Sequence, residues 1–400
     1  MPSGPTLDRV RIEIGELEAL REHRAAGRDL RHTVLVGLDL TGPAENELLR
    51  TSLDGALLLG CRLAPAARDR AEASGALVFP DIPELPYRAY RATLYTVAEL
   101  FTGLDPRHPE TYRDTPDARV YRHSRSIGGT TGHHPDPLHA LAERLHDHAI
   151  TEALEDLLAA CAVAGRANPV AVMGGHAFRR DSPEYRQAAE LGRAIGRSPA
   201  RFTVLTGGGP GAMEAIPLGV RLSTADDDQL AKALSELAAA PAFHATDSST
   251  VDDETIGRWV HAGLSLDLPE PEDLPRTIGI PTWFYGHEPP NPLCELHAKY
   301  FANSVREDGL LTVATGGVLY TPGRAGTVQE IFQDLTQNYY ESVGPAAPMV
   351  FLGKRFWTEE MPVADLLHRL ASGRAAERWI LITDDLAEAV ALLEDYAGTG

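Results

Sequence analysis

The stretch GGVLYTPGRAGTVQEIF, residues 316–332, decides the fold of the C-terminal half of the chain. An apolar run, Val318–Tyr320, leads into Pro322 and the loop Gly323–Thr327, and Glu330 follows. This order predicts a strand, a tight turn and the start of a helix. A helix N-terminus offers unpaired N–H groups and the positive end of the helix dipole, which suit a phosphate. The stretch therefore predicts a phosphate cradle with a carboxylate, Glu330, close to it.

Composition indicates a globular protein and excludes several classes. The 400 residues predict about two domains. The formal charge of −20, from 37 basic and 57 acidic residues, argues against binding of a nucleic acid polymer. The three cysteines show no paired spacing, which fits a reducing, cytoplasmic compartment. No apolar run approaches the ~18 residues of a membrane span, and the N-terminus lacks a signal-peptide core, so we expect no membrane partner.

Residues 1–137 predict a smaller α/β region, to which the sequence assigns no role. Short apolar runs alternate in it with helical patterns; the runs are 33–38, 56–59 and 76–79. Residues 103–137, rich in proline and glycine, are typical of a linker. A long helix is expected next, so residues 138–167 predict a connecting segment.

From residue 168 onward, strands and helices are expected to alternate regularly. A helix is expected over 293–306, and residues 222–275 predict an insertion on the surface. The apolar runs that predict strands are 170–173, 202–205, 277–280, 318–320, 349–352 and 379–382. Six strands separated by helices predict a doubly wound, Rossmann-like parallel sheet in residues 168–400. Ligands of such sheets bind beyond the carboxyl ends of the strands, where glycine-rich loops lie.

A second glycine loop lies in TGGGPGAMEA, residues 206–215. Four glycines occupy five positions, Gly207–Gly211, between a predicted strand and a predicted helix. Residues without a Cβ let the backbone approach an anion closely. The alternative is a tight strand–helix turn. A dinucleotide-binding loop also fits loosely, but no clear ribose-binding carboxylate ends the next strand, and no Walker A sequence is present.

Several motifs, taken in order, resemble the LOG (Lonely Guy) family of nucleoside 5′-monophosphate phosphoribohydrolases over roughly residues 168–396. GGGPGAMEA matches the family's GGGPGxMEA, PGRAGTVQE matches PGGxGTxxE, and DSPEY matches the segment after the first strand. KYFANSVRED resembles the helix that bears the family's active-site arginine. IGIPTWFYGHEPPNP resembles a segment of larger members that carries a glutamate and Asn-Pro, here Glu288 and Asn291 followed by proline.

The resemblance implies hydrolysis of a purine nucleoside 5′-monophosphate, such as AMP, to the free base and ribose 5-phosphate, without a metal or cofactor. It places Glu330 at the catalytic glutamate and Arg306 at the active-site arginine. A carboxylate near C1′ can stabilise an oxocarbenium-like ribose and activate water. The phosphate- or nucleotide-binding residues would be Gly175, His176, Gly207, Gly208, Gly209, Gly211, Met213, Glu214, Gly323, Arg324, Gly326 and Thr327. The resemblance also implies a homodimer or a larger homo-oligomer.

Arg324 departs from the family pattern, because it replaces the second glycine of PGG. Its side chain would either crowd the phosphate or add a cation to it. The alternative function is a non-catalytic nucleotide-binding sensor, and a dinucleotide-dependent redox enzyme is a third hypothesis. Without the resemblance, Glu330 is also typical of a solvated glutamate in a first helical turn, and Arg306 of a solvated arginine at a helix end.

Weaker signals concern histidines and aromatic residues. The histidines between His123 and His148 lack the i, i+4 spacing of a helical zinc site, so no metal is expected. Trp283 and Tyr285 fit either stacking on a base or packing in the core.

Overall fold

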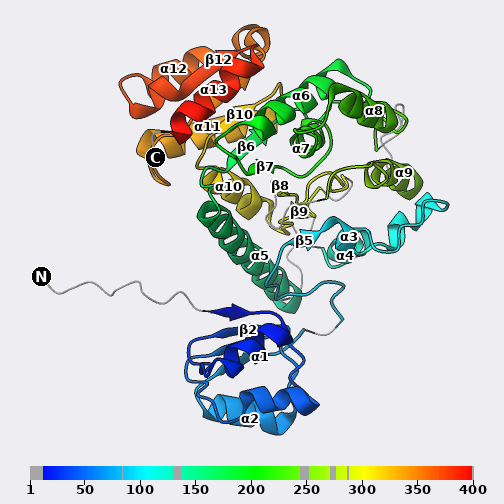
Figure 1. The fold of residues 1–400 in the computed structure, drawn as a ribbon, viewed down its shortest axis with the longest axis vertical. Helices are drawn as coiled ribbons and strands as arrows, with labels where there is room; N and C mark the ends of the chain where they lie inside the picture. Colours follow the sequence, from blue (N-terminus) through cyan, green and yellow to red (C-terminus); the bar gives the residue numbers. More distant parts are fainter. Residues whose placement is uncertain are drawn as a thin grey trace, which may run out of the picture. The chain divides into compact units, whose positions relative to one another are not determined.

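The computed structural model describes residues 12–82, 84–128, 137–243, 252–270, 276–285 and 288–398. The chain forms two compact units (Figure 1). The first unit is drawn from residues 1–93 and 135–153, and the second from residues 94–134 and 154–400.

The strands are β1 (Glu13–Ile14), β2 (Val34–Val36), β3 (Leu57–Leu59), β4 (Leu77–Phe79), β5 (Tyr95–Thr96), β6 (Val170–Met173), β7 (Val204–Thr206), β8 (Thr277–Gly279), β9 (Leu296–His297), β10 (Val318–Tyr320), β11 (Met349–Leu352) and β12 (Ile380–Thr383). The α-helices are α1 (Leu17–Ala25), α2 (Pro65–Ala73), α3 (Val97–Leu100), α4 (Pro116–Ser126), α5 (Pro137–Val163), α6 (Pro183–Arg197), α7 (Ala212–Arg221), α8 (Asp227–Ala238), α9 (Asp253–Leu264), α10 (Asn303–Val313), α11 (Ala325–Tyr340), α12 (Ala364–Ala371) and α13 (Leu386–Ala397). Short helical turns are η1 (Gly42–Leu48), η2 (Pro109–Asp114), η3 (Phe356–Glu360) and η4 (Ala375–Trp379).

The first unit contains, in its described residues, a four-stranded parallel sheet in the order β1-β2-β3-β4. Leu35 and Leu58 on its central strands are fully buried, because an apolar side chain on a strand gains most when it is removed from water. The apolar runs that predicted three of these strands are confirmed as β2, β3 and β4.

The second unit contains, among the residues described, an eight-stranded sheet in the order β12-β11-β10-β6-β7-β8-β9-β5. All neighbouring strands are parallel except β5, which runs antiparallel to β9. The predicted α/β class with parallel strands is confirmed, and all six predicted strands are present. From β6 the chain proceeds through β7, β8 and β9 on one side, and through β10, β11 and β12 on the other. The loops after β6 and β10 therefore diverge where this direction reverses, a position that favours ligand binding.

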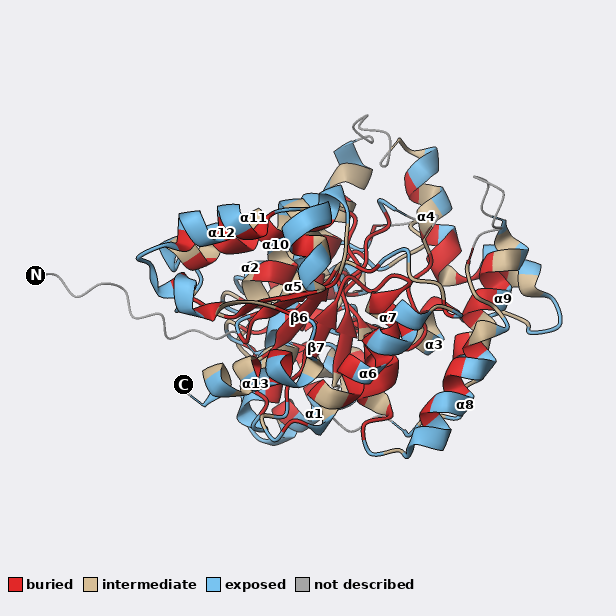
Figure 2. Ribbon diagram, turned by 90° about the horizontal axis from the view of Figure 1, so that it is seen from above, coloured by how far each residue is buried: buried red, intermediate tan, exposed pale blue. Residues whose placement is uncertain are grey.

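Helices cover both faces of this sheet. Helices α6 and α13 lie on one face, and α10, α11 and α12 lie on the other (Figure 2). Helices α6 and α7 approach closely because Gly219 has no side chain: a Cβ there would lie 1.9 Å from the carbonyl oxygen of Ala189. Among the described residues, no helix is both long and apolar enough to cross a membrane.

Two expectations about local structure are wrong. The helix expected over 293–306 is replaced by strand β9, which pairs with β8 and β5, and α10 begins only at Asn303. Because β9 pairs along both edges, its backbone N–H and C=O groups are hydrogen-bonded to neighbouring strands instead of within the helix that the local pattern predicts. The linker expected over 103–137 instead holds η2 and α4, and Thr115 caps α4 by accepting from the Ala118 N–H. Residues 129–136 lie outside the described residues.

Candidate functional site

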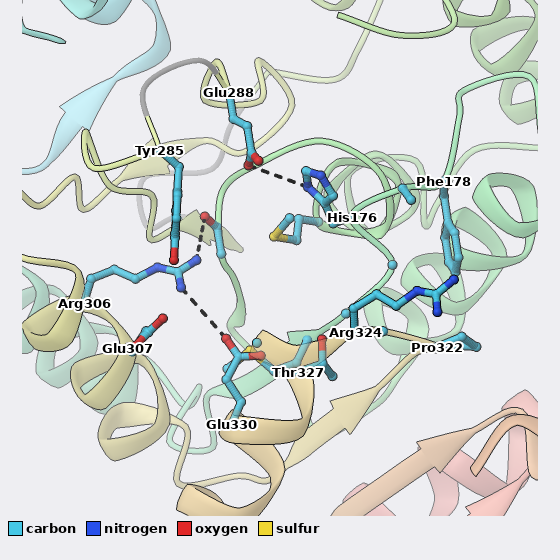
Figure 3. Close-up of a pocket in the computed structure, with 18 of the residues that line it drawn as sticks. His176, Phe178, Tyr285, Glu288, Arg306, Glu307, Pro322, Arg324, Thr327 and Glu330 are labelled. Atoms are coloured by element: carbon cyan, nitrogen blue, oxygen red, sulfur yellow. Dashed lines mark hydrogen bonds and ion pairs between the residues drawn. The ribbon is translucent and has the colours of Figure 1, made fainter. Parts of the chain in front are cut away.

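A cavity of about 430 Å³ lies beyond the carboxyl ends of β6, β7 and β10 (Figure 3). Its walls come from the segment 173–178, from Gly207 and Met213, and from the loop that opens α11. Side chains of α10 and α11 complete it, and among them are Arg306 and Glu330. Segments separated by up to about half of the chain thus meet at the point where the strand order reverses.

Arg306 is fixed in this cavity and faces Glu330. Its Nε donates to the carbonyl of Ile280 at 2.8 Å, and its Nη2 donates to that of Gly207 at 3.3 Å. Its Nη1 lies 3.9 Å from Oε1 of Glu330, and the two side chains are only 11% and 14% exposed. The guanidinium therefore presents one nitrogen to the carboxylate while two others are held by the backbone.

The environment of Glu330 brings the pKa of its carboxyl group close to neutral pH. Burial raises the pKa of Glu330 to about 7, the Arg306 guanidinium opposes this increase, and the Glu307 carboxylate adds to it. A carboxyl group with this pKa can gain and lose a proton near neutral pH, which general acid–base chemistry requires. The two residues that the resemblance assigned to catalysis are thus brought together.

The segment 207–214, which was predicted to bind a phosphate or nucleotide, borders the cavity only in part. Gly207 and Met213 line it, whereas Gly208, Gly209, Gly211 and Glu214 do not. Gly211 has a φ of +73°, and a Cβ there would lie 2.1 Å from the carbonyl oxygen of Gly175. The absence of a side chain at Gly211 therefore allows the loop to lie tightly against the segment after β6, and phosphate binding by this loop stays a prediction.

Glu214 belongs to a buried network outside this cavity. Arg180 donates to its carboxylate from Nε at 2.9 Å and from Nη2 at 2.5 Å, and the Tyr185 hydroxyl donates to it at 2.8 Å. The Glu214 side chain is fully buried, and the Arg180 guanidinium lies 4.1 Å above the Trp259 ring. Three donors to one carboxylate indicate a role in fixing α7.

The loop that opens α11, which was predicted to hold a phosphate, lines the cavity. Gly323, Gly326 and Thr327 all contribute, together with Arg324. A Cβ at Gly323 would lie 2.2 Å from Oγ1 of Thr327, so the absence of a side chain allows the loop to close onto the helix start. The first N–H groups of a helix have no partner within it, so this end of α11 is suited to an anion.

Arg324, the residue that departs from the family pattern, does not obstruct the pair formed by Arg306 and Glu330. Its exposed side chain extends toward Phe178, away from both residues (Figure 3). It adds a positive charge at the margin of the cavity.

Two further residues, Glu288 and Tyr285, line the cavity; the resemblance singled out Glu288 without giving it a role, and for Tyr285 the sequence left stacking on a base and core packing open. Oε2 of Glu288 lies 3.6 Å from Nδ1 of His176, which was predicted to lie in the site (Figure 3). Tyr285 also lines the cavity. Trp283 instead packs in the core, 1% exposed, and donates from Nε1 to Asp117 at 3.2 Å. The position of Glu288 and Tyr285 in the sequence is the feature that could have assigned them to the site. Both residues follow strand β8, whose carboxyl end faces the same edge of the sheet.

The histidine-rich region has no arrangement typical of a metal site in its described part. His146 is buried beside the ring of Tyr87, with ring centroids 5.5 Å apart, and burial lowers its pKa. His133 and His134 lie outside the described residues. Across the described ranges, no three His, Cys, Asp or Glu side chains are grouped to hold a metal ion.

A comparison with protein-family models and with curated proteins finds no match to this chain. Fold and site define the class of the molecule at a coarser level. It is an α/β protein with parallel sheets, and its cavity combines an anion-suited helix N-terminus with a buried Arg–Glu pair.

Proposed function

We propose that the protein hydrolyses the N-glycosidic bond of a purine nucleoside 5′-monophosphate, such as AMP, releasing the free base and ribose 5-phosphate. The observation that carries the proposal is the position of Glu330, a largely buried carboxyl facing Arg306 in the cavity at the start of α11. The motifs that resemble the LOG family supply these same two residues and support the same reaction.

The residues have complementary tasks in this reaction. The 5′-phosphate binds at the N-terminus of α11, beside Gly323 and Thr327, and no cofactor takes part. C1′ of the ribose lies near Glu330, whose carboxylate stabilises the positive charge that develops as the bond to the base breaks. The same carboxylate takes a proton from the attacking water. Arg306, held by two carbonyls, orients Glu330 and keeps a positive charge beside it.

The fold supports the proposal at the level of the domain. We assign residues 168–400 to a doubly wound, Rossmann-like nucleotide-binding domain, because its parallel strands diverge from β6 and its helices lie on both faces. Residues 138–167 are proposed as a connecting helix. The separate α/β region, expected over residues 1–137, is proposed for the unit drawn from residues 1–93 and 135–153, because residues 94–134 belong to the unit that holds the eight-stranded sheet. The proposal extends to a cytoplasmic homodimer or larger homo-oligomer.

The test is release of base from a set of monophosphates. Purified protein is incubated with AMP, GMP, IMP and CMP, and free base is measured by chromatography. The proposal expects release from at least one purine nucleotide. If folded protein releases base from none of them, the proposal is wrong. Binding of a nucleotide in calorimetry without any product would then favour the alternative, a non-catalytic sensor.

A further inference from the structure

The His176–Glu288 pair occupies the same cavity as the Arg306–Glu330 pair, but the proposed reaction leaves it without a task. Figure 3 shows His176 and Glu288 at the top of the cavity and the other pair below. The His176 side chain is 50% exposed and that of Glu288 is 24% exposed, so a ligand in the cavity can reach the imidazole.

The loop between β7 and α7 holds both residues of the His176–Glu288 pair in place. The side-chain nitrogen of Asn291, a fully buried residue, donates to the carbonyls of Gly209 and Met213, each at 3.1 Å. This attaches the segment that carries Glu288 to the loop between β7 and α7. The same loop lies against His176, since a Cβ at Gly211 would be 2.7 Å from the carbonyl oxygen of His176. Both partners are therefore positioned by one loop.

The reaction requires a second proton-transfer group. A purine leaves poorly as an anion, so a nitrogen of the base must be protonated as the bond breaks. Glu330 must be deprotonated to accept the proton of water, and a guanidinium does not give up a proton in proteins. When water attacks one face of the sugar, the acid must lie near the departing group on the opposite side. An imidazolium is a stronger acid than a phenol such as that of Tyr285.

We propose that His176, oriented by Glu288, is the proton donor to the departing base; this inference rests on the proposed function. The C1′–N bond breaks, and its electron pair goes to the base nitrogen, which takes the proton of His176 Nε2. Water adds its oxygen to C1′ and passes a proton to Glu330. Solvent then removes the proton from Glu330 and returns one to His176. The products are the neutral base and ribose 5-phosphate.

The test compares leaving groups. An N7-methylated purine nucleotide already carries a positive charge on the base and leaves without protonation. Wild type, His176→Asn and Glu288→Gln are assayed with AMP and GMP and with N7-methyl-AMP and N7-methyl-GMP. For His176→Asn we expect kcat on the unmethylated nucleotides to fall by about 100-fold or more, with kcat on the methylated ones within about threefold of wild type. Glu288→Gln, as a change to a positioning residue, should show the same selectivity with a smaller loss.

A matched control is His108→Asn. His108 also pairs with a carboxylate, Glu110, at 3.2 Å, but neither residue lines the cavity. This variant should cleave every nucleotide at the wild-type rate. Thermal unfolding of each variant reports whether it folds.

The outcomes separate the two proposals. Suppose that wild type cleaves the nucleotides, and that the activity of folded His176→Asn falls equally on methylated and unmethylated substrates or does not fall on either. His176 is then not the proton donor, and the proposed hydrolysis stands. If wild type releases base from no nucleotide, methylated or not, the proposed function and this inference both fail.

Discussion

At the scale of residues, the central feature is a carboxyl group whose proton is lost close to neutral pH. The pKa of Glu330 is raised to about 7, chiefly by burial, and only its deprotonated form can accept a proton from water. We therefore predict that kcat/KM rises with pH up to about 7. The measurement is base release from AMP in a series of buffers from about pH 5 to 8. A rate that falls over this range would contradict the role of Glu330 as a base.

Arg324 is predicted to support binding without taking part in chemistry. It lines the cavity, but its side chain points away from Arg306 and Glu330. Exposed charges contribute about 0.5–1 kcal/mol, so Arg324→Ala should raise KM roughly two- to fivefold and leave kcat unchanged. Arg355→Ala is the control, because Arg355 is 79% exposed and does not line the cavity. A large loss of kcat in Arg324→Ala would show that the arginine acts in the reaction itself.

At the scale of elements, the two glycine loops have different tasks, and a pair of substitutions distinguishes them. Gly211→Ala forces an unfavourable φ of +73° and a contact of 2.1 Å with a backbone oxygen, so it should destabilise the protein by roughly 2 kcal/mol or more. Gly326 is helical and has nothing within 4 Å of an added Cβ. Gly326→Ala should therefore be neutral or stabilising, by up to about 1 kcal/mol. Thermal and denaturant unfolding measure the stability of both variants. Equal changes in the free energy of unfolding would contradict the different tasks assigned to the two loops.

The sequence predicted the longer strands of both sheets, because short apolar runs between turns leave little choice in a buried parallel sheet, but it missed the two-residue strands β1, β5 and β9. Local patterns failed where a distant segment decides the structure. Strand β9 forms because β8 and β5 pair with it, and the residues next to it in the chain do not indicate this pairing. The proposed catalytic pair was found through motifs, whereas Glu288 and Tyr285 line the cavity because distant segments of the chain meet there, which no local pattern shows.

At the scale of the molecule, residues 94–128 belong to the unit that contains the cavity. Asp117 on α4 accepts from the Tyr112 hydroxyl at 3.0 Å and pairs with Lys299, which follows β9. Both charged side chains are almost fully buried, at 4% and 1% exposure. A stretch that was typical of a linker thus supplies the buried partner of a lysine beside the eight-stranded sheet.

Loss of this partner should destabilise the fold strongly. Asp117→Ala leaves the Lys299 charge buried without its carboxylate, which we expect to lower the free energy of unfolding by about 3–5 kcal/mol. The control is Glu254→Ala, which removes an exposed pair with Arg258 and should cost at most about 1 kcal/mol. Chemical denaturation measures the free energy of unfolding of both variants. A similar loss of stability in the two would contradict this account.

The most direct test of the proposed reaction is the rate of base release by Glu330→Gln relative to wild type. Gln preserves the shape of the side chain but removes its charge and its ability to accept a proton. We predict that kcat on AMP falls by about 1000-fold or more, while the dissociation constant for AMP, measured by calorimetry, stays within about threefold. Glu307→Gln, in a second carboxylate of the same cavity, should retain most of the activity. Base release by folded Glu330→Gln at the wild-type rate would contradict the account.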